Sequence, residues 1–424
     1  MDTVKKTISE SIALLFGSGL SILFYFMYQS TLAKELGPDK YGEFFSAFSL
    51  VNFFFILSLM GVNNSLLKLN ATSFNILNLK VISIIKFLFL NFIIVFSVLY
   101  LWAFFGPNDE HASNGIILLS LTLPSVIFME ILYSLNQIKG NFYQLSFHLF
   151  LINGFRFLIV FMFIKIFHSI DFYDALNIFV AISLLITVYI SFRFYFLLNK
   201  PKNNLKKIAS NNNFFNEYLD ILNLSKYFGI ANLCAFIWST SNVILINYFL
   251  GSSEAGIFAI VILAINGISM LPNVIYTKYL YGKYHYWSFH NKLKLREIYN
   301  KSNVTMILLG FLITSFLFIF TDKIILNVFG NDYKSSILLI LIYALFIPIK
   351  YYGHGPGAIL MLHDNIKIKV KIMILVAIIN TLINIIFIPI YGLLGALFSI
   401  IISESLLILL YFVKSKVFFN QLIS

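Results

Sequence analysis

Residues 11–44 read SIALLFGSGLSILFYFMYQSTLAKELGPDKYGEF, where an apolar run long enough to cross a bilayer ends at a polar break around Gly37 and Pro38. The pattern recurs to the end of the chain, giving twelve runs separated by short breaks. Helices are expected, because lipid-exposed strands would leave backbone groups unpaired and the runs do not alternate with period two. The expected spans are residues 11–33, 42–62, 81–105, 115–138, 145–167, 173–198, 222–249, 255–281, 303–328, 335–362, 367–390 and 392–414.

The composition indicates an integral membrane protein without a soluble domain. Of 424 residues, 59% are hydrophobic and 11% are charged, against about 45–50% and 25% in soluble domains. The first run is too long for a cleavable signal peptide and should remain as the first span. The single cysteine, Cys234, excludes an intramolecular disulfide, and the seven histidines lack metal-ligand spacing. We therefore expect no metal or other cofactor.

The distribution of the 30 Lys and Arg residues predicts the orientation. With a cytoplasmic N-terminus, 23 of them fall in or beside the inside breaks, five fall in the outside breaks and two lie within spans. This asymmetry follows the positive-inside rule, so both termini are expected in the cytoplasm and the spans in a bacterial inner membrane. The basic residues are read as topology signals rather than as a nucleic-acid surface.

The longest inside break divides the chain near its middle. We expect an N-terminal six-helix bundle at residues 1–199, a cytoplasmic linker at 200–220 and a C-terminal six-helix bundle at 221–424. Landmarks recur at offsets of 214 or 224 residues: Gly37 with Gly251, Gly42 with Gly256, Gly106 with Gly330, and Pro124 with Pro348. Each half has six spans, an even number, so the repeat is parallel. The expected fold is all-α, with two bundles related by a pseudo-twofold axis along the membrane normal and a substrate cavity between them.

Residues 31–42, TLAKELGPDKYG, resemble the "AR-LG-x-x-x-YG" signature of polysaccharide biosynthesis transporters in the MOP (MATE-like) superfamily. Residues 389–396, PIYGLLGA, resemble that family's "P-x-x-G-x-x-GA" segment, and FGNDY at 329–333 adds a third landmark. The family commonly has Arg where this chain has Lys34. The resemblance is greatest to O-antigen flippases of the Wzx type.

That resemblance implies a flippase that moves an undecaprenyl-diphosphate-linked oligosaccharide from the cytoplasmic to the periplasmic leaflet. It also suggests a polysaccharide polymerase and a chain-length regulator as partners, beside the phospholipid bilayer itself. A MATE-type cation-coupled drug exporter is the first alternative. A membrane enzyme is the second, but every outside break is about a dozen residues or fewer and offers no room for an active site.

Two basic residues lie well inside spans: Arg156 in span five and Lys350 in span ten. A diphosphate needs fixed positive charge in a wet cavity, since an unpaired charge in hydrocarbon is very costly. We therefore interpret both residues as lumen candidates for the anionic cargo. The alternative is that each pairs with a buried carboxylate, Glu130 or Glu404, only to hold helices together.

Span ten contains the segment PIKYYGHGPG at residues 348–357, whose prolines and glycines should break or kink a helix. The candidate hinge residues are Pro348, Gly353, Gly355, Pro356 and Gly357. His354 is four residues from Lys350 and offset by 224 from Glu130. Glu130, His354 and Glu404 are therefore candidates for ion coupling, the first two through protonation. A lone buried histidine is, however, more often a satisfied structural donor.

Polar residues within other spans are further lumen candidates. Asn153 lies three residues before Arg156, and the position offset by 224 from Arg156 is Asn380, four residues before Asn384. This suggests a polar stripe on spans five and eleven that contacts sugar. Gln29, Trp238 and Asn242 on spans one and seven are weaker candidates. Asparagine in membrane helices equally forms hydrogen bonds between helices, so both readings stay open.

Overall fold

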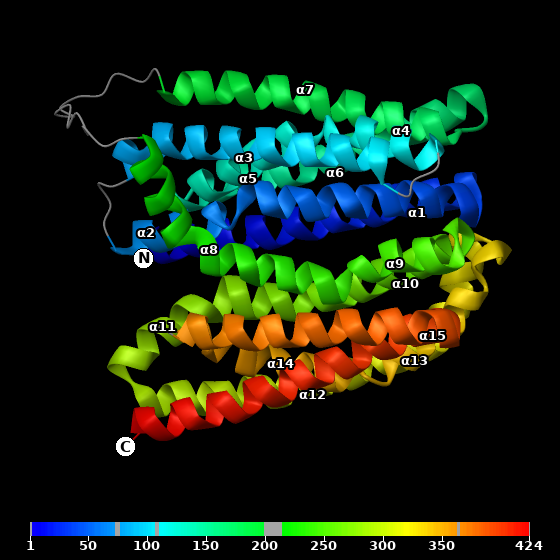
Figure 1. Cartoon of the computed structure of the whole chain (residues 1–424). Coiled ribbons are helices and arrows are strands. Elements are labelled where there is room, and N and C mark those ends of the chain that lie inside the picture. Colours follow the sequence, from blue (N-terminus) through cyan, green and yellow to red (C-terminus); the bar gives the residue numbers. More distant parts are fainter. Residues whose placement is uncertain (1, 73–76, 107–109, 199–213, 363–364, 424) are drawn as a thin grey trace. The chain divides into compact units, whose positions relative to one another are not determined.

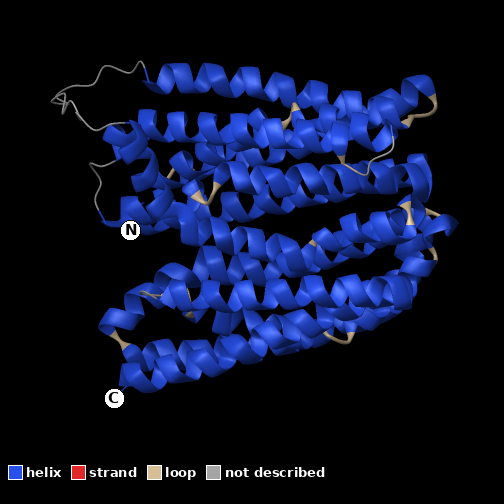
Figure 2. Ribbon diagram, in the orientation of Figure 1, coloured by secondary structure: helices blue, strands red, loops and turns tan. Residues whose placement is uncertain are grey.

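The computed structural model describes residues 2–72, 77–106, 110–198, 214–362 and 365–423, and these residues form helices joined by short loops (Figures 1 and 2). The helices are α1 (Asp2–Leu59), α2 (Val62–Thr72), α3 (Leu77–Phe105), α4 (Glu110–Ser120), α5 (Leu123–Ile138), α6 (Phe142–Phe167), α7 (Phe172–Leu198), α8 (Phe214–Ser239), α9 (Ser241–Leu250), α10 (Ser252–Asn273), η1 (Val274–Leu280), α11 (Tyr281–His290), α12 (Lys292–Ile324), η2 (Ile325–Phe329), η3 (Asn331–Tyr333), α13 (Ser335–Ala344), α14 (Ile347–Ile359) and α15 (Ile366–Ile423). No strand occurs in these ranges, as the sequence predicted.

The helices account for the twelve expected spans. Within the described residues, nine helical segments are long and apolar enough to cross a membrane, and α13 with α14 forms a tenth span bent by 54°. Two of the nine segments, of 52 and 55 residues, contain a non-helical glycine: Gly37 in α1 and Gly392 in α15. Each of these segments holds two spans, and Figure 1 shows α1 and α15 doubling back on themselves. The count therefore reaches twelve.

The repeat landmarks share an unusual backbone conformation. Gly37 (φ 71°, ψ 171°) and Gly251 (φ 98°, ψ 173°) are 214 residues apart, and Gly330 (φ 101°, ψ 176°) adopts the same geometry. A residue with a Cβ atom is strained there, so these breaks select glycine. The Gly37 and Gly251 landmarks thus mark equivalent helix breaks. Pro107, Asn108 and Asp109, beside the Gly106 landmark, lie outside the described residues.

The chain divides into two compact units: Met1–Leu36 with Ala47–Asn232, and Gly37–Ser46 with Leu233–Ser424. Most of the predicted linker, residues 199–213, lies outside the described residues. The domain limits at 1–199, 200–220 and 221–424 therefore stay predictions. The first part of α8, up to Asn232, belongs by its contacts to the first unit, and residues 37–46 belong to the second.

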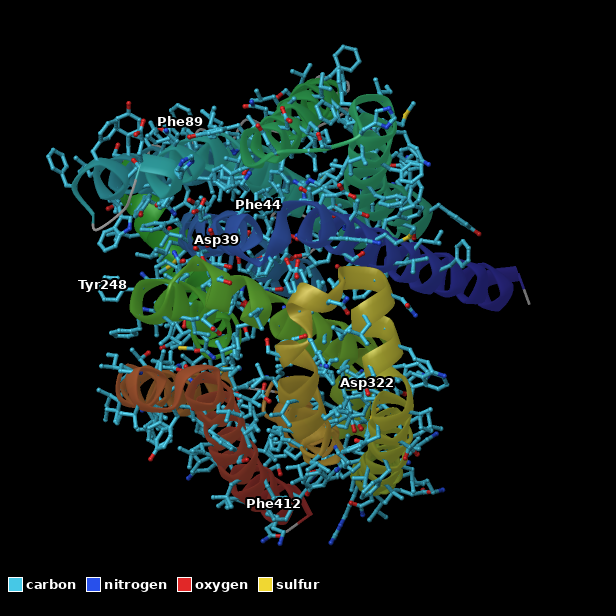
Figure 3. The ribbon with its side chains drawn as sticks, turned by 90° about the vertical axis from the view of Figure 1, so that its right-hand side faces the viewer. Asp39, Phe44, Phe89, Tyr248, Asp322 and Phe412 are labelled. Atoms are coloured by element: carbon cyan, nitrogen blue, oxygen red, sulfur yellow. The ribbon has the colours of Figure 1, made fainter. Side chains whose placement is uncertain are left out.

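Both units expose large apolar side chains that a bilayer would cover. Phe89 on α3 is 58% exposed and Tyr248 on α9 is 66% exposed, and both lie at the margin of their units (Figure 3). Leu308 and Leu312 on α12 are each 64% exposed. Apolar exposure on this scale marks a lipid-facing surface rather than a water-facing one. The buried positions include many polar side chains, and the candidate sites lie among these.

Candidate functional site

Arg156 lies in the first unit on α6 and is only 7% exposed. Its Nη2 donates a hydrogen bond to Ser183 Oγ on α7 at 3.3 Å, and its guanidinium carbon lies 3.8 Å from the centroid of the Phe179 ring. Its Nε has no hydrogen-bond partner among the described residues, and no carboxylate there lies within 4.0 Å of it. Arg156 is thus a buried cation whose charge is met by a hydroxyl and an aromatic face but by no anion.

Tyrosine and glutamine side chains surround Arg156. It interacts electrostatically with Tyr28, Tyr25 and Tyr133, which come from α1 and α5. Tyr25 hydrogen-bonds with Gln29, which is completely buried, and the Tyr28 hydroxyl has no partner among the described residues. These groups donate and accept hydrogen bonds without bringing a formal negative charge. The cluster can therefore receive an anion and polar hydroxyl groups together.

The carboxylate proposed as a partner for Arg156 has other contacts. Glu130 on α5 accepts a hydrogen bond at Oε2 from Asn63 Nδ2 on α2 at 3.0 Å. Its backbone carbonyl accepts from Ser134 Oγ at 3.0 Å. In the described part of the chain, no side-chain nitrogen of Arg156 lies within 4.0 Å of the Glu130 carboxylate oxygens, so the two residues do not form an ion pair. The acid and the base are thus separate features of the first unit.

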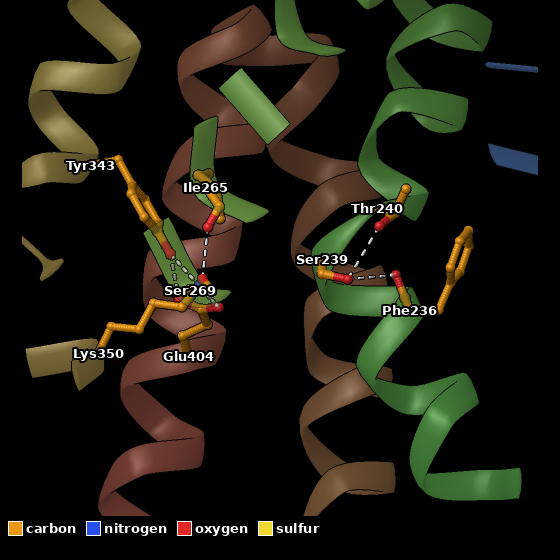
Figure 4. A network of polar contacts seen from close by, with 8 residues as sticks. All are labelled: Phe236, Ser239, Thr240, Ile265, Ser269, Tyr343, Lys350 and Glu404. Atoms are coloured by element: carbon orange, nitrogen blue, oxygen red, sulfur yellow. Dashed lines mark hydrogen bonds and ion pairs between the residues drawn. The ribbon is translucent and has the colours of Figure 1, made fainter. Parts of the chain in front are cut away.

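Lys350 in the second unit has a direct counter-charge (Figure 4). Its Nζ on α14 donates to Glu404 Oε1 on α15 at 2.8 Å and to the Tyr343 hydroxyl on α13 at 2.6 Å. Tyr343 in turn donates to Glu404 Oε2 at 2.9 Å. The Lys350 and Glu404 side chains are 12% and 8% exposed. This closed triad matches the structural alternative considered for Lys350.

The predicted asparagine stripe of span eleven lies in a hydrogen-bond network. Asn380 Nδ2 donates to Ser403 Oγ at 3.1 Å, across the two arms of α15. Asn384 Nδ2 donates to Asn242 Oδ1 on α9 at 2.7 Å and to Asn380 Oδ1 at 3.0 Å. The three asparagines are completely buried. They join helices of the second unit, although the Asn242 amide nitrogen has no partner among the described residues.

The remaining lumen candidates lie in two places. Asn153 donates to Ser21 Oγ on α1 at 3.0 Å, one turn from Arg156 and within the same unit. Trp238 on α8 is 8% exposed. Close to it, Ser239 contacts Thr240 Oγ1 at 3.2 Å (Figure 4). Of the predicted site residues, the structure therefore gathers Gln29, Asn153 and Arg156 in one unit and the Lys350 and Asn380 groups in the other.

Span ten bends before its glycines rather than at them. The 54° bend lies between α13 and α14, just before Pro348, which occupies the first turn of α14. The segment 348–357 itself is helical, with Pro356 inside it. A Cβ atom on Gly353 would overlap Ile408, and one on Gly355 would overlap Asn303 Oδ1. The glycines thus allow α14 to pack closely against α12 and α15.

His354 lies on α14 of the second unit, against Tyr276 of η1. Its ring stacks on Tyr276 with centroids 6.4 Å apart and planes 13° apart. Lys350 and Lys369 act on it electrostatically. Tyr276 donates to Asn303 Oδ1 at 2.9 Å. His354, Glu130 and Glu404 stay predicted coupling residues. The described residues hold no group of three or more His, Cys, Asp or Glu placed to bind a metal.

Sequence reasoning missed the tyrosines and the serine that complete both clusters. Tyr25 lies four residues before Gln29, and Tyr133 lies three residues after Glu130, so helical spacing already places each beside a candidate. Tyr343 lies seven residues before Lys350, but the bend between α13 and α14 separates them, so helical spacing does not connect this pair. Ser183 has no such signal, because only the packing of α6 on α7 brings it to Arg156.

No known family profile matches the chain, and no curated protein matches it. Solved structures do match its fold. A multidrug resistance MATE family transporter of the MOP superfamily in an outward-facing conformation aligns with a TM-score of 0.66 at 15% identity, covering 99% of this chain and 96% of that one. Such a transporter in an inward-facing conformation aligns at 0.66 and 14% identity, covering 97% and 98%.

A MOP superfamily transporter from Pyrococcus furiosus aligns with a TM-score of 0.57 at 14% identity, covering 99% of this chain and 96% of that one. It is described as having a binding pocket of reverse polarity, which suggests a different function for that protein. At these identities the similarity establishes the fold alone. The chain is a multi-pass membrane protein with the fold of MATE family transporters of the MOP superfamily.

Proposed function

We propose that this protein is a transporter that moves a lipid-linked oligosaccharide with a diphosphate group from the cytoplasmic to the outer leaflet of the membrane. The observation that carries the proposal is Arg156, a buried guanidinium without a carboxylate within 4.0 Å in the described part of the chain. A buried cation is costly unless an anion meets it. A phosphate oxygen bound by the guanidinium fork would supply that anion.

The surroundings of Arg156 suit the rest of such a cargo. Tyr25, Tyr28 and Gln29 offer hydroxyl and amide groups to sugar hydroxyls, and Tyr133 adds another. Lys350 is a weaker candidate for contact with the phosphate, because Glu404 already neutralises it at 2.8 Å. The anionic cargo is therefore assigned to the first unit. The reversed pocket polarity described for the Pyrococcus furiosus protein supports the idea that this fold serves more than one charge class of cargo.

A cation-coupled drug exporter is the second candidate, and Glu130 favours it. This carboxylate lies inside the same unit without an ion pair in the described residues, so a cationic drug or a coupling ion could bind there. The two functions differ in which side chain is essential. The flippase requires Arg156, and the exporter requires Glu130.

The test uses purified protein in vesicles, with a fluorescent polyprenyl-diphosphate oligosaccharide in one arm and a cationic dye in the other. Loss of a charge-assisted hydrogen bond of about 1.5–3 kcal/mol predicts that Arg156→Ala slows flipping by about 10- to 100-fold. Arg156→Lys should retain part of the activity, and Arg156→Glu should be slower than Arg156→Ala. The control is Lys165→Ala, which removes one positive charge from an exposed position of the same helix.

Normal flipping by folded Arg156→Ala would reject the anion site. Dye transport by the parent that Glu130→Gln abolishes and Arg156→Ala leaves intact would assign the protein to drug export instead. The quantity of each variant in the membrane is measured by immunoblot, so that a loss of transport is separated from a loss of protein.

A further inference from the structure

A cavity of about 410 Å³ lies in the second unit, away from the residues discussed above as cargo contacts. It opens between the first part of α12 and the last part of α15. The residues that carry its chemistry are Arg296, Asn300, Asn303, Ser415, Lys416 and Asn420. Its apolar walls include Tyr299, Tyr352, Phe412 and Phe419.

The polar lining has the character of an anion site. Besides the two tyrosines, it contains two cations, three amides and the Ser415 hydroxyl, and none of its lining residues is acidic. Neither Arg296 nor Lys416 has an ion pair in the described part of the chain, where the carboxylate next to Arg296, Glu297, is paired with Lys301. Guanidinium, ammonium and amide groups converging without a carboxylate are suited to a phosphate group.

Packed aromatic rings form the apolar side of the cavity. Tyr299 and Phe419 pack with ring centroids 4.9 Å apart, which joins α12 to α15, and Tyr352 of α14 packs on Phe412 at 5.9 Å. The Lys416 ammonium lies 4.4 Å from the centroid of the Phe412 ring. Tyr299 and Phe419 are 7% and 8% exposed, so the floor of the cavity is well packed. The site thus combines two buried rings, Tyr299 and Phe419, with two exposed cations, Arg296 and Lys416.

One ridge of α12 leads from charged to apolar side chains. Arg296, Asn300, Val304 and Leu308 follow at intervals of four residues and therefore form a continuous ridge that winds slowly around the helix. The first three line the cavity, and Val304 and Leu308 are 58% and 64% exposed. Leu312 continues the same ridge at 64% exposure. A ligand with a phosphate at one end and an apolar chain at the other matches this sequence of side chains.

We propose that this cavity binds the phosphate headgroup of an anionic membrane phospholipid, whose acyl chain lies along Val304, Leu308 and Leu312 of α12. The phosphate contacts Arg296 and Lys416, with Asn300 and Asn420 as further donors. Free phosphate offers the same anionic group but has no apolar chain to lie along α12. The lipid carrier of the cargo has both a phosphate group and an apolar chain. The proposal does not depend on the identity of the cargo.

The experiment measures binding of phosphatidylglycerol to the full chain in detergent by native mass spectrometry, with phosphatidylcholine, polyprenyl phosphate and inorganic phosphate as parallel probes. The parent should retain phosphatidylglycerol in preference to phosphatidylcholine. Arg296→Gln with Lys416→Gln should weaken that binding by about tenfold or more, because each basic residue near a membrane surface contributes appreciably to anionic-lipid binding. Lys292→Gln with Lys294→Gln is the matched control, since it removes two exposed charges of the same helix outside the cavity lining.

Three results would overturn the proposal. Equal loss in the control pair would mean that general surface charge attracts the lipid. Binding of inorganic phosphate as tight as that of the lipid would assign the cavity to a free anion. A preference of tenfold or more for polyprenyl phosphate would assign it to the cargo's carrier lipid. If the double variant is less stable without lipid, Lys416→Gln alone is measured, because that side chain is exposed and should leave the fold intact.

Discussion

Arg156 and Lys350 are both cations inside apolar helices, yet their surroundings differ in one decisive respect. Lys350 meets Glu404 at 2.8 Å and Tyr343 at 2.6 Å, which completes a neutral triad. Arg156 meets Ser183 and the face of Phe179, neither of which carries a charge. The triad therefore serves as an internal reference for Arg156: one buried cation has a carboxylate beside it, and the other has none within 4.0 Å among the described residues.

The triad leads to a prediction about stability. Breaking a buried ion pair by removing one partner costs about 3–5 kcal/mol, because the remaining charge stays uncompensated. Lys350→Met or Glu404→Gln alone should therefore lower the unfolding temperature in detergent, and Lys350→Met with Glu404→Leu should recover most of the loss. The vesicle assay with the lipid-linked oligosaccharide should find transport largely retained in the double variant. A stable double variant without transport would instead place the pair in the transport mechanism.

For single residues, the sequence could identify the ionisable candidates within the spans but not the residues that they contact. Arg156, Lys350, Glu130 and Glu404 are visible because ionisable residues are rare in apolar spans. Which base pairs with which acid depends on the rotation and depth of each helix, and these are set by packing. Lys350 and Glu404 are 54 residues apart, and no spacing rule connects them.

At the scale of helices, glycines decide which elements can touch. A Cβ atom on Gly42 would overlap the carbonyl oxygen of Ser252, and one on Gly256 would overlap that of Pro38. Pro38 and Ser252 are 214 residues apart, as are Gly42 and Gly256. The contact is thus reciprocal. Gly42 lies against Ser252, and the equivalent glycine, Gly256, lies against the equivalent residue, Pro38. All four residues belong to the second unit. The first turns of two equivalent spans cross here around a local twofold relation.

This crossing predicts a stability effect. Gly42→Ala and Gly256→Ala should each destabilise the protein by about 1–3 kcal/mol, because the added methyl group meets backbone that must shift. Their combination should be non-additive, since both changes act on one contact. Gly267→Ala on α10 is the control, as its Cβ atom would meet nothing within 4 Å, and it should raise stability by about 0.5–1 kcal/mol. Equal unfolding temperatures for Gly42→Ala and Gly267→Ala would contradict the close crossing.

The packing of α14 also explains why span ten bends at a different place from the one that its sequence suggests. Two prolines and three glycines suggested a break within residues 348–357. Pro348 instead lies in the first turn of α14, where a missing amide hydrogen costs nothing, and the bend falls on the two residues between α13 and α14. The glycines serve packing against Ile408, Asn303 and Tyr411. Local composition predicts that a span is irregular, but only the tertiary contacts show where its bend lies.

For the whole molecule, length and hydropathy could predict the helices, the number of spans and the repeat, because a bilayer leaves the backbone few alternatives. Positions such as Gly37 and Gly251 were informative, because residues other than glycine are strained in their backbone geometry. The cavity between α12 and α15 was not predictable. It depends on Tyr299 and Phe419 meeting across 120 residues of sequence, and neither residue stands out among the 48 Phe and 24 Tyr.

The last prediction concerns the orientation of the chain in the membrane. The 23 to 5 distribution of basic residues predicts that both termini and the central linker are cytoplasmic. Within the first unit, the N-terminus lies at the same end as α2, and within the second, the C-terminus lies at the same end as α11 (Figure 1). Both arrangements follow because an even number of spans separates each terminus from the helix beside it: two between the N-terminus and α2, and four between α11 and the C-terminus.

Alkaline phosphatase fused after Lys207 or Ser424, both outside the described residues, should therefore be inactive, because this reporter works only outside the cytoplasm. The same reporter fused after Ser252, in a predicted outside break, should be active, and a cytoplasmic reporter should give the reverse pattern. Activity of the phosphatase at Lys207 with inactivity at Ser252 would invert the orientation. Activity at only one of Lys207 and Ser424 would mean an odd number of spans between them, which the parallel repeat does not permit.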